Sequence, residues 1–358
     1  MIYIISCIVL GFAILMGGIF YKFHKDINTF DTQYVKDFIE TNKTDPSFSL
    51  YAKYNEQVLW DINRDQILPL ASTVKTIIAI EYAYQVANKQ INPFEKVTKE
   101  ELDRHYLANC DGGAHEAWLK TISTNNITLN EVAKGMIAFS SNANTDFLLK
   151  KLGIEAVNYR LQALNLHDHT EIYPLVSALY VPLYLHQEKQ VSIKNIAAVI
   201  ENMEMQEFVQ YVLQMHNRLL EKPFSIEDKV KATKLLKLNV QKALSDKLPS
   251  STTRMYCELM SMLNSKNVLP AEVYRYLDPI MEQIMAQESY RTQYKHFGRK
   301  GGSTVFVLTD TVYSTDIDGN KFELAFFANN LNMIEQRRLS KNLRPYYEEY
   351  IKRLIRVN

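Results

Sequence analysis

The sequence predicts an α+β fold, because strand-like segments occur near both ends of the chain and a long helical block lies between them. Apolar and polar residues alternate within 48–62, and strand character returns only at 303–308 and 321–327. Helical periodicity dominates from residue 72 to about residue 293. We therefore expect one antiparallel sheet that is flanked by terminal helices and packed on an inserted all-α domain.

The first elements of the soluble part are a helix and a hairpin. Apolar residues recur with helical spacing over 30–42, which predicts a helix. The segments 48–54 and 57–62 alternate with a two-residue period on either side of Asn55-Glu56, a pattern typical of a β-hairpin. Two antiparallel strands are therefore expected to open the domain.

The last elements are two strands and a helix. The segments 303–308 and 321–327 are rich in β-branched and aromatic residues and are separated by a Gly-Asn turn within 316–320. A closing helix is expected over 334–357, where large apolar residues recur on one side.

These elements define a single domain over 28–358. Its sheet part is expected to combine 28–68 with 298–358, and its helical part to span 69–297. Within the helical part, about 183–249 is rich in amphipathic helix and is interpreted as an extra insertion. The insertion is either a lid over the ligand groove or a peripheral packing element, and the sequence favours neither.

The N-terminus predicts a membrane anchor over residues 1–21. No charged residue occurs from Ile2 to Phe20, a length that can cross a bilayer as a helix, and no small-x-small site for signal cleavage follows. Lys22 and Lys25 lie after this run and nothing basic precedes it, which favours a cytoplasmic C-terminal side. That orientation conflicts with the function inferred below, which requires an extracytoplasmic domain.

Composition excludes several classes of function. With 47% apolar and 23% charged residues the chain is an ordinary globular protein, and its net charge of +1 gives no field that would attract nucleic acid. Neither the three cysteines nor any group of histidines and carboxylates has a recognisable metal-ligand spacing. We predict no disulfide, no metal and no cofactor.

The first motif with chemical potential is Ser72-x-x-Lys75 at the start of a strongly apolar helix. Side chains three residues apart share a helical face, so the Lys75 amine can approach the Ser72 hydroxyl. Desolvation lowers the pKa of a lysine, and a neutral amine can then accept the proton of a nucleophilic serine. The alternative is a helix-capping serine beside a solvated lysine.

Two further motifs follow in the order that such a site requires. Ser140-Ser141-Asn142 offers a hydroxyl and an amide that can relay a proton and bind a substrate amide, although the same pattern can also cap a helix. Arg299 to Ser303, with Lys300, Gly301 and Gly302, offers a cation and an unobstructed strand backbone, along which a peptide-like substrate can lie. A loop with paired glycines is the alternative.

A last candidate is the loop that contains Asp111, two glycines and His115. Such a loop can bind substrate near Ser72, whereas a turn with a surface histidine is the default interpretation.

Together, the three motifs resemble those of the serine β-lactamase and penicillin-binding protein family, whose signature is Ser-x-x-Lys, Ser-Asp-Asn and Lys-Thr-Gly. The resemblance extends over about 48–331 and is greatest to a class A β-lactamase domain. It implies a β-lactamase or transpeptidase type of fold and acyl transfer through an acyl-serine. The implied partner is a small-molecule or peptide substrate.

The resemblance also implies a role for each matching residue. Ser72 corresponds to the acylated nucleophile, Lys75 to its base and Ser140 to the proton relay. Asn142 corresponds to a ligand of the substrate amide and Lys300 to the partner of a substrate carboxylate. The backbone N–H groups of Ser72 and Ser303 would form the oxyanion hole.

The sequence departs from the family pattern at three places. Ser141 replaces the aspartate of the second motif, and Gly301 replaces the hydroxyl residue of the third. Where class A enzymes carry a deacylating glutamate, this chain places Tyr173, with Glu171 nearby but offset. We therefore expect a hydrolase that acts on a β-lactam or related amide or ester, and keep two alternatives: a D-alanyl peptidase of the cell wall and a non-catalytic binding homologue.

Overall fold

The computed structural model describes residues 30–123 and 127–357, which belong to two compact units. One unit combines the described residues up to Asp45 with those from Leu331 onward, and the other is Pro46–Asn330. The predicted anchor, 1–21, lies outside the described residues. Within the described ranges, no helix has the length and apolar character needed to span a bilayer.

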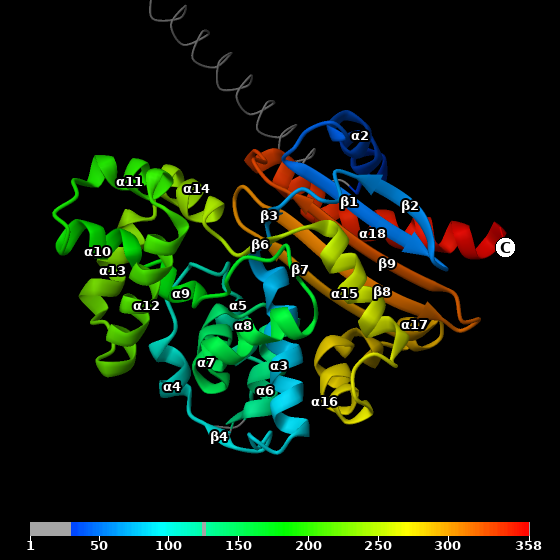
Figure 1. The fold of residues 1–358 in the computed structure, drawn as a ribbon, viewed down its shortest axis with the longest axis horizontal. Helices are drawn as coiled ribbons and strands as arrows, with labels where there is room; N and C mark the ends of the chain where they lie inside the picture. Colours follow the sequence, from blue (N-terminus) through cyan, green and yellow to red (C-terminus); the bar gives the residue numbers. More distant parts are fainter. Residues whose placement is uncertain (1–29, 124–126, 358) are drawn as a thin grey trace, which may run out of the picture. The chain divides into compact units, whose positions relative to one another are not determined.

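The unit Pro46–Asn330 contains the predicted antiparallel sheet, with strand order β2-β1-β9-β8-β7 (Figure 1). Its strands are β1 (Phe48–Tyr54), β2 (Gln57–Ile62), β7 (Tyr294–Ser303), β8 (Leu308–Asp316) and β9 (Lys321–Ala328). All neighbouring strands are antiparallel, and β1 pairs with β9, so strands from the two ends of this unit lie side by side. The strand β7 lies at one edge of the sheet, as expected for the segment that contains Lys300.

The predicted strand over 303–308 is wrong. Its apolar middle, Val305 to Val307, forms the turn between β7 and β8, in which the Thr304 hydroxyl oxygen accepts hydrogen bonds from the backbone N–H groups of Phe306 and Val307. The true strand β7 begins earlier, at Tyr294, and its sequence is polar and contains three glycines. An edge strand with this composition lacks the apolar alternation on which the prediction relied.

Helices form most of the rest of this unit, as predicted. Before the extra segment they are η1 (Ala71–Val74), α3 (Lys75–Ala87), α4 (Lys99–Arg104), α5 (Ala114–Leu119), α6 (Leu129–Ala138), α7 (Asn142–Leu152), α8 (Ile154–Ala163) and α9 (Leu175–Ala178). After it they are α15 (Thr253–Ser265), α16 (Ala271–Met281), η3 (Gln283–Ala286) and α17 (Glu288–Arg291). The helix α15 packs against β1, β8 and β9, whereas α3 is surrounded by α6, α7, α8 and α16.

The central position of α3 follows from its composition. Nearly every side chain in it is buried, and its apolar residues are distributed around the whole helix rather than on one face. A helix that is apolar all round belongs in the interior of a protein. Its first residue, Lys75, is therefore buried as well.

Two short strand pairs complete the unit. They are β3 (Leu68–Pro69) with β6 (Ser250–Ser251), and β4 (Lys96–Val97) with β5 (Ile127–Thr128). The first pair joins the chain just before Ser72 to the chain that follows the extra helical segment.

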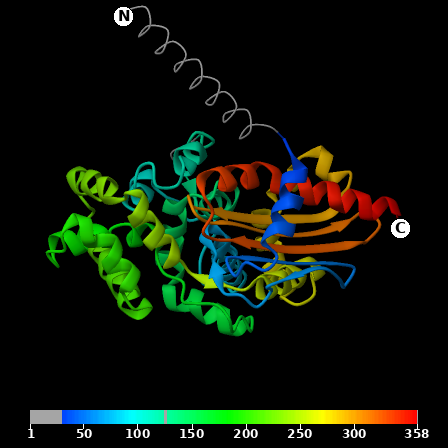
Figure 2. The same ribbon diagram turned by 90° about the horizontal axis from the view of Figure 1, so that it is seen from above.

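The extra helical segment forms a cluster of its own beside α7 and α9 (Figures 1 and 2). Its helices are α10 (Val181–Gln187), η2 (Ile193–Asn195), α11 (Ile196–Asn202), α12 (Met205–Glu221), α13 (Ile226–Leu235) and α14 (Leu238–Asp246). The helix α12 packs on α9, and α14 ends where the Ser245 hydroxyl donates a 3.0 Å hydrogen bond to Thr304 Oγ1 in the β7–β8 turn.

The other unit consists of two helices, α2 (Thr32–Asn42) and α18 (Met333–Val357), that pack on each other. Asp31 caps α2 and joins it to α18, because its carboxylate accepts a 2.9 Å hydrogen bond from Arg338 and its N–H donates to Asn342 Oδ1 at 2.8 Å. The sequence predicted both helices to within a few residues.

Candidate active site

The site begins at the junction of η1 and α3. Ser72 lies in the tight turn η1, immediately after Ala71, whose φ of 45° is in the left-handed region that non-glycine residues rarely adopt. Such strain persists only where the surrounding structure holds it, and it is common at functional sites. The Ser72 side chain is half-buried, and its hydroxyl has no hydrogen bond to a described side chain.

The sheet holds this junction in place. Thr73 Oγ1 and Thr309 Oγ1 are 2.7 Å apart, and Thr309 donates a 2.8 Å hydrogen bond to the Leu70 carbonyl oxygen. The strand β7 approaches so closely that a Cβ atom at Gly302 would lie 2.4 Å from the backbone nitrogen of Ser72. Only a glycine permits this contact between the edge strand and the start of α3.

The Lys75 amine is buried next to Ser140 and Asn142. Lys75 Nζ donates hydrogen bonds to the Ser140 carbonyl oxygen at 2.5 Å and to Asn142 Oδ1 at 2.7 Å, and Ser140 Oγ lies 3.3 Å away. Burial, reinforced by the charge of Lys300, holds the pKa of Lys75 well below its usual value. The neutral form of this amine, which has a lone pair that can accept a proton, is therefore more accessible than in a solvated lysine.

Ser140 connects the two lysines. Its φ of 68° turns the chain sharply before α7, and Lys300 Nζ donates a 3.0 Å hydrogen bond to Ser140 Oγ. Lys300 also donates to the Gly301 carbonyl oxygen at 2.6 Å. Thus residues 75, 140, 142 and 300, which the sequence predicted as parts of one site, are joined by hydrogen bonds, and Ser72 lies in η1 next to Gly302 of β7.

Lys300 is buried, and burial with the nearby Arg299 guanidinium lowers the pKa of Lys300 to about 7. Arg299 is itself held by a bidentate ion pair with the buried carboxylate of Asp310, at 2.8–2.9 Å. The Lys300 amine therefore loses its positive charge as the pH rises through about 7.

The loop residues Asp111 and His115 lie next to the turn that contains Ser140 and Ser141. His115 is fully buried, and its Nδ1 is 2.9 Å from Ser141 Oγ, while the Asp111 carboxylate accepts the backbone N–H groups of Ala114 and His115. Ser141 in turn caps α7 by accepting the N–H of Asn144 at 3.2 Å. The buried imidazole thus supports the turn that carries Ser140.

The loop before α9 contains Glu171 and Tyr173. The Glu171 side chain is exposed, and the buried Tyr173 hydroxyl donates a 2.5 Å hydrogen bond to the Lys247 carbonyl oxygen. No carboxylate within the described residues has a hydrogen bond to Lys75, Ser140 or Asn142.

Three contributors to this site were missed from the sequence. They are the Ser140 carbonyl oxygen, the bond between His115 and Ser141, and Asp146, whose carboxylate accepts backbone N–H groups at the start of α9. A backbone carbonyl has no sequence signature. Ser141 stands where the family pattern has an aspartate, and this departure was the one sequence signal that the turn makes a different polar contact, here with His115.

The assembled groups can perform acyl transfer. They offer a half-buried hydroxyl at a helix start, a desolvated amine and a second hydroxyl that links two lysines. The edge strand β7 runs past the hydroxyl and can pair with an extended, peptide-like ligand.

Comparison with known proteins identifies the family. The model of the β-lactamase enzyme family matches residues 32–332, whereas no curated protein matches the chain. The structure of PBP-A is 16% identical, with a TM-score of 0.50, and covers 89% of this chain and 96% of its own.

Two further structures have the same fold. A class A β-lactamase from Bacteroides cellulosilyticus is 14% identical, with a TM-score of 0.50, and covers 88% of this chain and 97% of its own. A β-lactamase from Sphaerobacter thermophilus is 15% identical, with a TM-score of 0.51, and covers 87% and 94%. At such low identity these structures show the fold alone, and they confirm the predicted α+β class with its all-helical domain. The family match extends over most of the sequence, and the chain therefore belongs to the β-lactamase enzyme family.

Proposed function

We propose that this protein is a serine hydrolase that forms an acyl-enzyme on Ser72 from a β-lactam or a related amide or ester. One observation carries the proposal: the buried Lys75 amine, with its lowered pKa, is bound to Ser140 and Asn142 and follows Ser72 by three residues at the junction of η1 and α3. A purely structural lysine gains nothing from burial without a carboxylate partner.

The first step is attack on the substrate carbonyl. A neutral Lys75 donates its two N–H groups to the Ser140 carbonyl oxygen and Asn142 Oδ1, so that its lone pair remains to accept the Ser72 proton. The Ser72 oxygen then forms the new C–O bond as the carbonyl carbon becomes tetrahedral. The backbone N–H groups of Ser72 and Ser303 are assigned to the resulting oxyanion.

The second step expels the amine. The C–N bond breaks, and the leaving nitrogen takes a proton from Ser140 Oγ, which recovers one from the lysines that it contacts. Lys300 and the Asn142 amide bind the substrate carboxylate and amide, respectively. Because Gly301 has no hydroxyl, Lys300 binds that carboxylate with one fewer partner than the family pattern provides.

Hydrolysis of the acyl-serine is expected to be slow. The Tyr173 hydroxyl is bonded to the Lys247 carbonyl and Glu171 is exposed, so neither is in place to activate a water molecule. This favours, as a second candidate, a D-alanyl peptidase of the cell wall, which uses the same motifs without a deacylating glutamate.

The deciding experiment is intact-mass spectrometry after incubation with a penicillin. We expect an adduct of the mass of one penicillin that persists for minutes or longer and is absent from Ser72→Ala. Rapid loss of both drug and adduct would instead indicate a β-lactamase with an unrecognised deacylating base. No adduct and no drug loss in the folded wild-type protein would contradict the proposal and favour a non-catalytic binding homologue.

The proposed substrates also bear on location. We propose that residues 1–21 anchor the chain in a membrane with the catalytic part outside the cytoplasm, where cell-wall peptides are found. An alkaline-phosphatase fusion after Asn358 should then be active. An inactive phosphatase fusion with an active cytoplasmic reporter would contradict a cell-wall role.

A further inference from the structure

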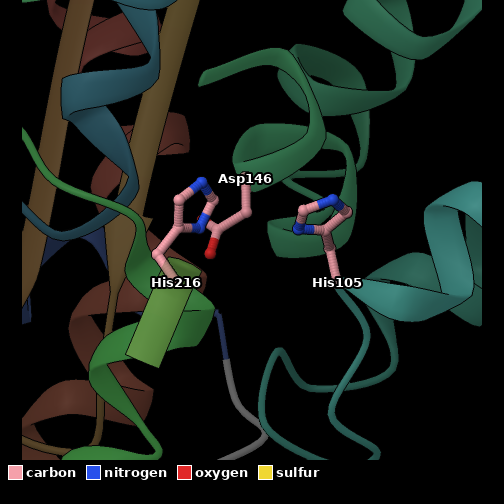
Figure 3. A group of neighbouring side chains, drawn as sticks. All are labelled: His105, Asp146 and His216. Atoms are coloured by element: carbon pink, nitrogen blue, oxygen red, sulfur yellow. The ribbon is translucent and has the colours of Figure 1, made fainter. Parts of the chain in front are cut away.

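A cluster of three buried side chains lies outside the proposed catalytic groups. His105 follows α4, Asp146 belongs to α7 and His216 belongs to α12, and one potential ligand atom from each lies within 4.8 Å of the others (Figure 3). Their exposed fractions are 1%, 0% and 3%, respectively. Two imidazoles and a carboxylate are a ligand set that proteins use for divalent transition metals.

One buried nitrogen atom of the cluster is left unsatisfied by the protein. The buried Nδ1 atom of His105 has no hydrogen-bond partner, and no hydrogen bond or ion pair joins Asp146 to either imidazole. Figure 3 shows a nitrogen of each ring turned toward the Asp146 side chain, which lies between the rings. A buried polar atom without a partner is costly, and such atoms are rare in folded proteins.

The charge states of the two histidines suit metal binding. Burial lowers the pKa of His105 to about 3 and that of His216 to about 4, so both rings are neutral at pH 7 and can offer a lone pair. Burial raises the pKa of Asp146 to about 7, and a bound dication would favour its ionised form.

Backbone groups fix the carboxylate in place. Asp146 Oδ1 accepts the N–H of Leu175 at 2.7 Å, and Oδ2 accepts those of Val176 and Ser177 at 2.9 and 3.2 Å. The Ser177 hydroxyl lies 3.2 Å from His216 Nδ1. Such outer contacts orient metal ligands and are typical of metal sites in proteins.

We propose that His105, Asp146 and His216 bind one divalent transition metal, of which zinc is the best match. Zinc–ligand distances of about 2.0–2.2 Å place tetrahedral ligand atoms about 3.4 Å apart, so ligand atoms that lie within 4.8 Å of one another must close by at most about 1.4 Å on binding. Water or the Ser177 hydroxyl would complete four coordination. Magnesium and calcium are disfavoured because both prefer oxygen ligands.

The second histidine–carboxylate cluster differs in a decisive way. Asp278, Glu282 and His296 also lie close together, but Lys266 donates hydrogen bonds to both carboxylates, at 2.7 and 2.5 Å. The Lys266 ammonium group therefore already lies between the carboxylates, where a metal ion would bind. This cluster provides an internal control for non-specific binding.

The position of the proposed metal gives it a structural consequence. His216 belongs to the extra helical segment, whereas Asp146 lies on α7, the helix that follows the catalytic Ser140 turn. A metal would therefore cross-link α12 to the helical core in addition to their packing contacts. Because it binds the folded state, it would stabilise the protein by an amount that grows with the logarithm of the free metal concentration above the Kd.

The test uses the untagged full chain, 1–358, because a histidine tag binds metals. After removal of metal by EDTA, Zn²⁺ is titrated in competition with a chromophoric chelator, and Co²⁺ absorption in the visible region reports the geometry. We expect one equivalent to bind with a Kd below about 1 μM and to raise the Tm. The variants His105→Gln and His216→Gln should each bind at least about 100-fold more weakly.

His296→Gln is the matched control, because it removes a histidine from the lysine-occupied cluster, and its affinity should equal that of the wild type. The proposal is overturned if the wild type binds no Zn²⁺, or if binding is lost in His296→Gln but kept in the other two variants. If either ligand variant fails to fold, X-ray absorption of the wild-type zinc complex decides: two imidazole ligands support the site, and none or one overturns it.

Discussion

At the scale of residues, the site depends on two lysines that share one serine. Lys75 and Lys300 both contact Ser140 Oγ, at 3.3 and 3.0 Å, and the charge of Lys300 helps to lower the pKa of Lys75. Two buried ammonium groups this close repel each other, so the neutral form of one is favoured. Ser140 Oγ thus lies between two amines, of which one is favoured in its neutral form.

The rate of acylation should depend on pH with a rising and a falling limb. It rises with pH because Lys75 must be neutral to accept the Ser72 proton, and its pKa is lowered well below the usual value. It falls above about pH 7, where the free protein loses the Lys300 charge that attracts a substrate carboxylate. The second-order rate of adduct formation, measured from pH 5 to 10, checks both limbs.

Lys300→Arg separates the two limbs. Arginine remains protonated throughout this range, so the variant should keep the rising limb and lose the falling one. If wild type and variant have the same falling limb, Lys300 does not carry the charge in question.

His115 is predicted to be a positioning residue. Its imidazole, 2.9 Å from Ser141 Oγ, supports the turn that carries Ser140, so His115→Ala should lower the acylation rate roughly 10- to 100-fold. The variant should also lose about 1–3 kcal/mol of unfolding free energy, because a buried polar group is left without its partner. Rates come from adduct mass, and stabilities from urea unfolding.

Two variants control for this prediction. His167 is exposed, so His167→Ala should leave both quantities unchanged. His115→Asn keeps a polar side chain and should restore part of the acylation rate. Equal rates in His115→Ala and the wild type would show that the turn needs no support from the imidazole.

The residues that could be predicted are those with fixed local spacing. Ser72 and Lys75 are one helical turn apart, and Ser140 and Asn142 share one turn of the chain, so short motifs reveal them. His115 contacts Ser141 from 26 residues away, a relation without local periodicity. The same limit hid the His105, Asp146 and His216 cluster, in which each ligand comes from a different helix region.

At the scale of elements, the approach of β7 to the start of α3 places Ser72 against the edge strand. Gly302 allows this contact, and a methyl group there would lie 2.4 Å from Ser72 N and 2.7 Å from the Leu70 carbonyl oxygen. Both atoms belong to the backbone and cannot move aside without shifting the junction.

Gly302→Ala is therefore expected to separate β7 from η1. The adjacent Gly301→Ala is a matched control, because its nearest neighbours would lie at 3.4 Å, an ordinary contact. We expect Gly302→Ala to cost about 1–3 kcal/mol of unfolding free energy and to lower the acylation rate, whereas Gly301→Ala changes stability by less than about 0.5 kcal/mol. Equal unfolding free energies for the two variants would show that the junction adapts easily.

The same strand shows where element prediction fails. The sheet strands β1, β2 and β9 alternate or carry β-branched and aromatic residues, and their bounds agree with the sequence pattern. By contrast, β7 is an edge strand in which Gly298 and Gly302 allow close contacts with Tyr313 and the start of α3, so it lacks the apolar alternation typical of a strand. The apolar run after it forms a turn because Thr304 caps it.

At the scale of the whole molecule, fold class was predictable because the order of strand and helix periods is a property of long segments. The detailed packing of the extra helical segment was not predictable, since amphipathic helices can pack in several arrangements. The structure places its last helix, α14, in contact with the β7–β8 turn through Ser245 and Thr304. That contact connects the segment to the edge strand of the site.

Burial of a lysine links the site to the stability of the entire unit. The pKa of Lys300 is about 7 in the folded protein, against 10.5 for the free side chain. Between these values the unfolded chain holds a proton that the folded protein has released, so the free energy of unfolding must rise with pH. Below pH 7 both states are protonated, and this contribution to the pH dependence disappears.

Lys300→Met tests whether Lys300 causes this pH dependence, because the other titratable groups are the same in the variant and the wild type. Methionine has a similar length and no charge, so its burial costs less, and the variant should be more stable than the wild type near pH 7. The difference should shrink by a few kcal/mol between pH 7 and 10, because each unit of pKa shift corresponds to about 1.4 kcal/mol. Urea unfolding of both proteins at pH 7, 8.5 and 10 measures it. A stability difference that stays constant over this range would mean that Lys300 keeps its proton in the folded protein, and the lowered pKa, together with the falling limb of acylation, would have to be abandoned.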